Sequence, residues 1–145
     1  MSLNELLRRG SVERRAPDPR EIRDLARSAR RQIQDARVPG LSAEASYQLA
    51  YTGVLALATL AVRAAGYRLR AGEGLHRRTF EAARAALGGA SRALLDFFEL
   101  CRRRRNVISY EGSEASEVEA VDLLEQATKF EKLVRDWSRQ TRAPF

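Results

Sequence analysis

The chain has few of the residues that carry covalent or metal chemistry, with one cysteine, Cys101, and one histidine, His76, among 145 residues. A single cysteine excludes an intrachain disulfide, and this pair cannot supply the ligand spacing of a zinc site. Nor does their spacing support a Cys/His catalytic pair. The sequence also lacks a nucleophile elbow and a GxGxxG pattern, which disfavours classical hydrolases and Rossmann-type proteins. We expect no metal and no cofactor, and we interpret Cys101 as a small buried hydrophobe.

Proline and glycine are also scarce, with four and nine residues, and runs of β-branched residues are missing. Stretches rich in alanine, leucine and arginine dominate instead, a composition typical of helices. The length allows one domain with a real core. We therefore predict an all-α fold, an up-and-down bundle of four to five helices joined by short connections.

The predicted domain covers residues 18–140. A basic N-terminal extension over 1–17 precedes it, in which Leu3 to Arg9 is expected to form a short helix before a turn-like stretch. Residues 141–145 are expected to form a frayed tail. No internal repeat and no second domain boundary is visible in the sequence.

Capping residues predict where the first two long helices begin. Asp18 is placed as an N-cap, with Pro19 at the first helical position and Glu21 placed for a capping box. Ser42 is expected to cap the next helix, which should run to about Ala65, with an extension to Arg70 as the alternative.

The same signals divide the second half of the chain. A short helix is predicted over Arg77 to Leu87, and Ser91 is expected to cap the helix that follows. Gly112 should end that helix. Either Ser113 or Ser116 is then expected to cap the last helix, and Ser116 begins a second capping box, Ser116–Glu119.

The stretch from Ala45 to Val62 contains no charged residue and is long enough to raise the question of a membrane span. It includes several polar side chains and five alanines, so we interpret it as a central helix buried on most sides. The first residues, Met1 to Leu6, lack the basic and apolar regions of a signal peptide. We expect a cytoplasmic protein that does not enter a membrane.

Positive charge dominates, with a formal net charge of +7 and a pI near 10.4. Arginine supplies nearly all of it, since the only lysines are Lys129 and Lys132. Arginine is the better residue for bidentate phosphate contacts. The balance favours nucleic acid or another acidic partner through nonspecific attraction.

Four consecutive arginines, Arg102 to Arg105, precede the segment Asn106–Tyr110. Arg105 falls on an otherwise apolar helical stripe formed by Leu94, Phe98, Cys101 and Ile108. A cation on a core-facing stripe costs several kcal/mol unless it is paired or reaches water in a cleft. Its position therefore indicates a site.

If the helix persists, five polar side chains share an arc of roughly 140°. Two guanidinium groups, an amide, a hydroxyl and a phenol suit a phosphate and a base. The residues of this arc are Arg102, Arg105, Asn106, Ser109 and Tyr110. Arg103 and Arg104 are expected to point outward. The alternative is that Arg105 pairs with an acidic residue of another helix and that Tyr110 plugs the end of the bundle.

These residues resemble the motif of the HEPN (higher eukaryotes and prokaryotes nucleotide-binding) family, in which an arginine, a polar residue and three further positions precede a histidine. The match is Arg105, Asn106 and Val107-Ile108-Ser109, with Tyr110 in the histidine position. The likeness covers roughly residues 20–138. Three upstream segments also resemble the family: Ala50–Gly53, Ala65–Arg68 and Leu75–Phe80.

The resemblance implies a helical bundle that dimerises and brings two copies of the motif into one cleft. Many members are metal-independent endoribonucleases, often toxins paired with a nucleotidyltransferase antitoxin. By this resemblance Arg105 would contact the scissile phosphate and Asn106 would support the geometry. Dimerisation is also expected because Phe97, Leu100 and Val107 give the motif helix a second apolar face.

Tyr110 is the departure from the family pattern. Tyrosine has a reference pKa near 10, against about 6.5 for histidine, so it is a poor general base at neutral pH. We therefore expect RNA or nucleotide binding at a dimer cleft, with weak or no ribonuclease activity. One alternative is a ribonuclease that tolerates tyrosine, and His76 is a remote candidate for a replacement base. The other is a structural helical protein that partners a nucleotidyltransferase subunit.

Overall fold

The computed structural model describes residues 1–112, 114–141 and 145, and most of this part of the chain is helical. The predicted all-α bundle is confirmed. A two-stranded antiparallel sheet is the one addition to it. The elements in chain order are α1 (Leu3–Arg8), β1 (Val12–Arg14), α2 (Pro19–Ala36), α3 (Ala43–Ala64), β2 (Tyr67–Leu69), α4 (Leu75–Leu87), the 3₁₀ turn η1 (Gly89–Ser91), α5 (Arg92–Glu111) and α6 (Glu117–Gln140).

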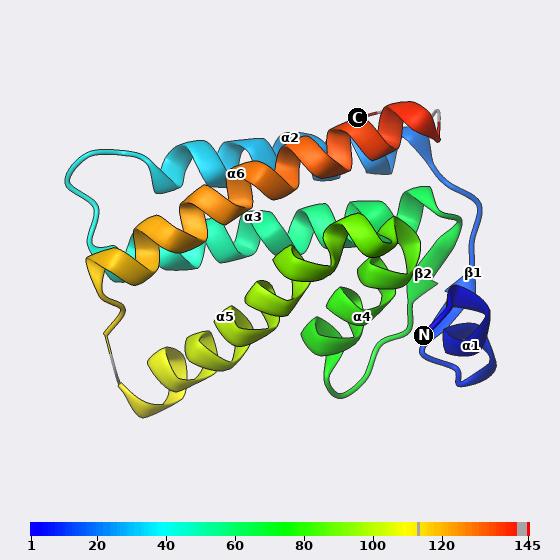
Figure 1. The fold of residues 1–145 in the computed structure, drawn as a ribbon, viewed down its shortest axis with the longest axis horizontal. Coiled ribbons are helices and arrows are strands. Elements are labelled where there is room, and N and C mark those ends of the chain that lie inside the picture. The colour runs from blue at the N-terminus through cyan, green and yellow to red at the C-terminus, as the bar shows by residue number, and fades with distance from the viewer. Residues whose placement is uncertain (113, 142–144) are drawn as a thin grey trace.

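Helix α3 is the centre of the bundle. It packs against α2 and α6 on one side and against α4 and α5 on the other, as Figure 1 shows. By length and composition it could cross a membrane, but more than half of its most apolar window is buried inside the bundle. The core helix of a bundle needs the same apolar composition, so its central place accounts for the uncharged stretch from Ala45 to Val62.

Helices α2 and α3 approach closely at Gly53. A Cβ atom at this position would lie 2.9 Å from Cγ1 of Ile33 and 3.3 Å from the carbonyl oxygen of Ala29. Glycine is therefore required here by the packing of α2 rather than by a turn. The contact fixes the register between the two helices.

Three of the predicted helix starts are confirmed. The side chain of Asp18 accepts a hydrogen bond from the backbone of Arg20, and Ser42 caps α3 in the same way. Ser116 and Glu119 form the predicted capping box at the start of α6. Each of these signals depends on residues within four positions of one another, so it can be read locally.

Other local expectations need correction. Ser91 does not cap α5 with its side chain, because its hydroxyl donates to the carbonyl of Gly88 inside the 3₁₀ turn. Helix α4 begins at Leu75, two residues earlier than predicted. Gly112 ends α5 in the left-handed conformation, as expected, and Ser113 lies outside the described residues.

The stretch after α1 is not a simple turn, because Val12–Arg14 pairs with Tyr67–Leu69 as an antiparallel ladder. Helix α3 accordingly stops at Ala64 and does not continue to Arg70, with Gly66 at a φ of +91° where the chain turns into β2. Leu6 and Val12 are buried in the core. Part of the predicted N-terminal extension therefore packs as an integral part of the bundle.

The expected apolar stripe of α5 faces the core. Phe98, Cys101 and Ile108 are buried, and the ring of Phe98 packs edge-on against Phe130 of α6 with a centroid distance of 5.1 Å. In the predicted tail, residues 142–144 lie outside the described residues. Phe145 lies against the Arg135 guanidinium, whose Cζ atom is 5.1 Å from the ring centroid.

Candidate functional site

The four consecutive arginines of α5 have different surroundings. Arg102 binds Glu99 through two nitrogens, with Nη2 at 2.7 Å from Oε1. Arg103 is 68% exposed and lies 3.8 Å from the same carboxylate. Arg104 does not point freely outward as predicted, because its Nε donates to Glu119 of α6 at 2.6 Å. Three of the four arginines thus have a carboxylate partner.

Arg105 has neutral partners instead. Its Nε donates to Oε1 of Gln48 at 3.1 Å, and its Cζ lies 5.1 Å from the centroid of the Tyr51 ring. Within the described chain no carboxylate forms an ion pair with Arg105. The expected alternative, in which an acidic residue of another helix neutralises this charge, is therefore not what the structure contains.

Helix α3 positions this contact. Gln48 and Tyr51 are three residues apart, so they lie on one face of α3, toward α5. Tyr51 is fully buried, whereas Arg105 is partly exposed. The aromatic face and the amide hold the guanidinium at the edge of the bundle, in contact with water.

The Tyr51 ring also connects this cation to His76 at the start of α4. Its hydroxyl lies 3.2 Å from Nδ1 of His76, and the two ring centroids are 5.9 Å apart. When the imidazole carries its proton on Nε2, the phenol donates to Nδ1. Three helices thus contribute to one cluster of Arg105, Gln48, Tyr51 and His76, which we call the α3–α5 cluster.

The electrostatics of the cluster follow from burial and from the two arginines. Burial lowers the pKa of His76, and the positive charges of Arg105 and then Arg102 lower it further. Burial raises the pKa of Tyr51 to about 12, with both arginines acting against the rise. At neutral pH the imidazole and the phenol are therefore uncharged, and the guanidinium groups carry the charge of the site.

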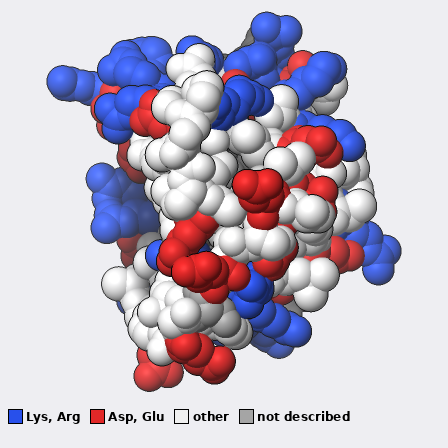
Figure 2. Space-filling model, turned by 90° about the vertical axis from the view of Figure 1, so that its left-hand side faces the viewer, with Lys and Arg blue, Asp and Glu red and all other residues white. Residues whose placement is uncertain are grey.

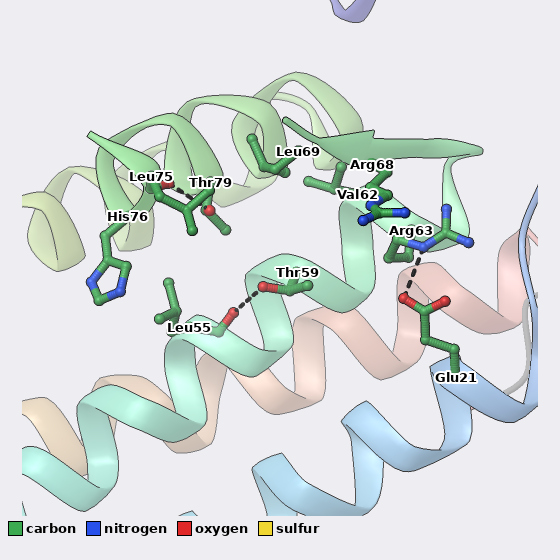
Figure 3. Close-up of a pocket in the computed structure, with 10 residues that line it drawn as sticks. All are labelled: Glu21, Leu55, Thr59, Val62, Arg63, Arg68, Leu69, Leu75, His76 and Thr79. Atoms are coloured by element: carbon green, nitrogen blue, oxygen red, sulfur yellow. Dashed lines mark hydrogen bonds and ion pairs between the residues drawn. The ribbon is translucent and has the colours of Figure 1, made fainter. Parts of the chain in front are cut away.

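A cavity of about 270 Å³ lies beside His76, between α3, β2 and α4. Figure 3 shows His76 at the opposite end of this cavity from the ion pair between Arg63 and Glu21. The walls between them are mostly apolar, with Leu55 and Val62 from α3 facing Leu75 from α4. The hydroxyls of the threonines in the wall donate to carbonyls of their own helices.

The deeply buried cation of the fold is Arg63, whose side chain is 3% exposed. Its Nε donates to Glu21 at 2.9 Å, and its terminal nitrogens donate to the carbonyls of Arg15, Ala16 and Tyr67. This use of Glu21 explains why it does not complete the capping box predicted for α2. Arg63 is a structural cation that donates four hydrogen bonds, one of them to a carboxylate, which distinguishes it from Arg105.

The remaining predicted site residues lie farther along α5. Asn106 is partly buried, and Ser109 is exposed. Tyr110 is 85% exposed, so it does not plug the end of the bundle. The structure thus brings Arg105 together with Tyr51 and His76, whereas Tyr110 extends into solvent within a single chain.

Sequence reasoning missed Gln48 and Tyr51 as partners of Arg105, and it gave His76 little weight. The available signal was a pair of large polar side chains, Gln48 and Tyr51, three residues apart in a stretch of core helix that has no charged residue. Such residues need partners when they are buried. The sequence does not reveal which helix supplies those partners.

Among the described residues, no group of three or more His, Cys, Asp or Glu side chains could hold a metal ion. Cys101 is buried, and burial raises the pKa of its thiol to about 11, so it is not a reactive thiolate. No family model, no curated protein and no solved structure matches this chain. The likeness to the HEPN family therefore rests on the motif and the three upstream segments of the sequence.

Proposed function

We propose that the protein binds RNA or a nucleotide through the phosphate group, with Arg105 as the principal contact and with weak or no cleavage. The observation that carries this proposal is the set of neutral partners around Arg105. A partly buried cation whose charge is not cancelled by a carboxylate is suited to an anionic ligand.

The donor geometry supports a phosphate in particular. The hydrogen bond to Gln48 uses Nε, and in the described chain no hydrogen bond occupies Nη1 or Nη2 of Arg105. These two nitrogens can bind two phosphate oxygens as a fork. Stacking on Tyr51 holds the guanidinium plane, so less side-chain freedom is lost on binding. Arg102 lies one turn away on the same helix, but its charge is paired with that of Glu99.

Weak or absent cleavage follows from the available bases. Tyr110, in the position where the family has a histidine, is exposed and supplies a phenol in place of an imidazole. Tyr51 remains a neutral phenol, because its pKa is raised to about 12. Neither tyrosine can accept a proton efficiently from a ribose 2′-hydroxyl.

A metal-independent ribonuclease is the second candidate, and the position of His76 favours it. The imidazole is neutral at physiological pH and is connected through Tyr51 to the Arg105 guanidinium. In this alternative the N–H group at Nδ1 of His76 donates to the Tyr51 oxygen, which holds the ring in place and leaves Nε2 as the base. Cleavage by the parent that persists with chelator and is lost in His76→Gln would establish it.

The test of binding is fluorescence anisotropy with a labelled single-stranded RNA, comparing the parent with Arg105→Ala. The matched control is Arg103→Ala, which removes the same charge two residues away from an exposed position. Because hydrogen bonds to charged groups contribute about 1.5–3 kcal/mol, we expect Arg105→Ala to lose at least about tenfold in affinity. The control should lose much less.

Thermal unfolding of the same variants excludes a trivial loss of structure. Arg105→Ala should melt at the parent's temperature or above, since it removes a partly buried charge that has no carboxylate partner. Equal affinities for the two alanine variants would refute the assignment of Arg105. Absence of RNA binding by the parent, even at low salt, would favour a structural protein that partners a nucleotidyltransferase.

A further inference from the structure

A second basic feature lies on the side of the bundle opposite to α4 and α5. A groove of about 510 Å³ runs between α2 and α6, which pack against each other over α3. Two cationic residues of α2, Arg30 and Arg37, line it, together with three of α6, Lys129, Lys132 and Arg135. Both lysines of the protein are thus in this one place.

Negative charge in the groove is limited to one lining carboxylate, that of Glu131. It is 15% exposed and binds Arg135 at 2.7 Å, with Arg30 at 3.9 Å. Lys132 pairs with Asp136 of its own helix at 3.3 Å. Five cations therefore face one lining carboxylate and one neighbouring carboxylate, and the groove keeps a clear positive excess.

Two of the cations are not committed to any carboxylate in the described chain. Arg37 donates to the hydroxyl of Thr128 at 2.6 Å, and Lys129 forms no ion pair there. The Lys132–Asp136 pair is exposed and contributes about 0–1 kcal/mol, and Arg30 lies no closer than 3.9 Å to Glu131. Arg135 is held more firmly by the largely buried Glu131. An incoming phosphate can therefore recruit the other four cations without breaking a strong contact.

The cations are arranged along a line rather than at a point. Arg30 and Arg37 are seven residues apart on one face of α2, a rise of about 10 Å. On α6, Lys129, Lys132 and Arg135 are spaced three residues apart beside them, where Arg37 contacts Thr128 and Arg30 approaches Glu131. This length exceeds the spacing between neighbouring phosphates of a strand. The groove thus offers contacts to several phosphates in succession.

The surface view agrees with this distribution. Figure 2 shows Lys and Arg side chains gathered along the upper edge of the molecule, at the level where α2 and α6 lie in Figure 1. Acidic side chains are prominent in the middle and lower parts of the same face. On this face, positive charge is therefore concentrated toward the edge formed by α2 and α6.

We infer that the groove between α2 and α6 binds the sugar–phosphate backbone of single-stranded RNA. A concave, linear site with arginine forks suits a strand of phosphates, because each guanidinium can bind two oxygens of one group. No aromatic residue lines the groove in the described chain, so bases are not stacked there and binding is independent of sequence. A lipid surface fits less well, since the one aliphatic lining residue, Ile33, is buried and cannot insert.

This inference rests on the proposed function in naming RNA as the ligand, but it concerns a different surface. The α3–α5 cluster holds one phosphate at Arg105, whereas the groove provides a line of contacts on the other side of α3. The two contributions can be separated, because changes in the groove leave Gln48, Tyr51 and His76 untouched.

The test compares two double variants with equal loss of charge. Arg30→Gln with Lys129→Gln removes two groove cations, and Arg31→Gln with Arg139→Gln removes two exposed arginines of the same helices that do not line the groove. Binding of a labelled single-stranded RNA to the full chain is titrated between about 50 and 200 mM salt. Arg105→Ala and Arg103→Ala are measured alongside, and thermal melting checks that every variant is folded.

The slope of log K against log salt is the decisive quantity. Single-stranded phosphate contacts contribute about 0.7 each, so the groove variant should have a slope shallower by about 1.4, whereas the control keeps the parent slope. Equal slopes for the two double variants would refute RNA binding in the groove. The role of Arg105 would still be decided separately, by the affinities of Arg105→Ala and Arg103→Ala. Retained RNA binding with loss of binding to phosphatidylcholine vesicles containing phosphatidylserine would assign the groove to a lipid surface. A parent that does not bind RNA overturns both proposals.

Discussion

The buried hydroxyl of Tyr51 lies 3.2 Å from Nδ1 of His76, while the guanidinium of Arg105 lies over the same phenol ring. One aromatic side chain therefore couples a titratable group of α4 to a cation of α5. The charge of Arg105 affects His76 without a direct hydrogen bond between them.

The first prediction concerns the pH dependence of stability. The folded-state pKa of His76 is lowered by burial and by Arg105, so the unfolded chain binds the proton more readily. The contribution of neutral His76 is fully present above the unfolded pKa near 6.5 and is lost as pH falls through the lower folded pKa. Chemical denaturation at pH 7.5 and pH 5 should show a smaller loss of stability for His76→Gln than for the parent.

Arg105→Gln is the matched test of the coupling between these groups. Removing the cation should raise the pKa of His76, measured by NMR titration of the imidazole. The loss of stability at acidic pH should then be smaller, because the folded-state pKa moves toward the unfolded value. Arg103→Gln should leave the His76 pKa close to that of the parent. An unchanged pKa in Arg105→Gln would mean that burial alone sets it.

The second prediction concerns Arg63, whose buried guanidinium donates hydrogen bonds to Glu21 and to three backbone carbonyls. Arg63→Met keeps much of the side-chain volume but leaves three carbonyls and Glu21 without their donor. We expect a loss of about 3 kcal/mol in the free energy of unfolding, measured with urea. Arg68→Met, on the exposed side of β2, should stay within about 0.5 kcal/mol of the parent. Similar stabilities for both variants would show that the buried guanidinium contributes little.

The third prediction is a homodimer through the junction of α5 and α6. Leu100 is 62% exposed, and Val118 and Val121 of α6 are exposed as well. Leu100 also lines a small hollow with Phe97 of α5, so apolar surface from two helices is accessible there. We expect light scattering at tens of micromolar to give the mass of a dimer, because such surface favours a packing partner.

The control for the dimer uses charge at two exposed apolar positions. Leu100→Glu should give monomers, since it places a carboxylate in the proposed interface. Val38→Glu, in the connection between α2 and α3, should remain dimeric. A monomeric parent would rule out both this interface and a cleft shared between two copies.

The fourth prediction separates binding from catalysis. Tyr110→His restores the residue usual in the HEPN family, and an exposed imidazole titrates close to neutral pH. We predict that RNA cleavage becomes measurable with chelator present, because the variant gains a competent base. Tyr110 extends into solvent within one chain, so this activity should also depend on dimerisation.

Ser109→His is the positional control, since it adds the same imidazole one residue earlier on the exposed part of α5. It should not cleave RNA. Adding Arg105→Ala to Tyr110→His should remove the activity. Cleavage that survives this addition would show that Arg105 does not participate in the reaction.

Local features of the sequence predicted much of the fold. Asp18-Pro19 and Ser116–Glu119 were sufficient to place the starts of α2 and α6, because cap and backbone lie within one turn. The two strands were not predictable in this way. Each has three residues, and their partners are more than fifty positions apart, so no periodicity could develop.

The candidate site was predictable only in part for the same reason. The apolar stripe of α5 placed Arg105 correctly at the edge of the core, since helical spacing is a local property. Its partners Gln48 and Tyr51 come from a helix about fifty positions earlier, and their approach depends on the packing of α3 against α5. Glu21 shows the opposite effect: its expected local role in the capping box of α2 is replaced by a hydrogen bond from Arg63, 42 positions away.

Arg63 holds the N-terminal segment against the bundle. Its guanidinium donates hydrogen bonds to the carbonyls of Arg15 and Ala16. Leu6 and Val12 of the same segment are buried in the core. The N-terminal segment thus binds the bundle as an intramolecular ligand, and its covalent link to α2 gives it a high effective concentration. If a protease cut the chain before α2, this segment could dissociate. The stability of the remaining bundle would then depend on the concentration of the released peptide.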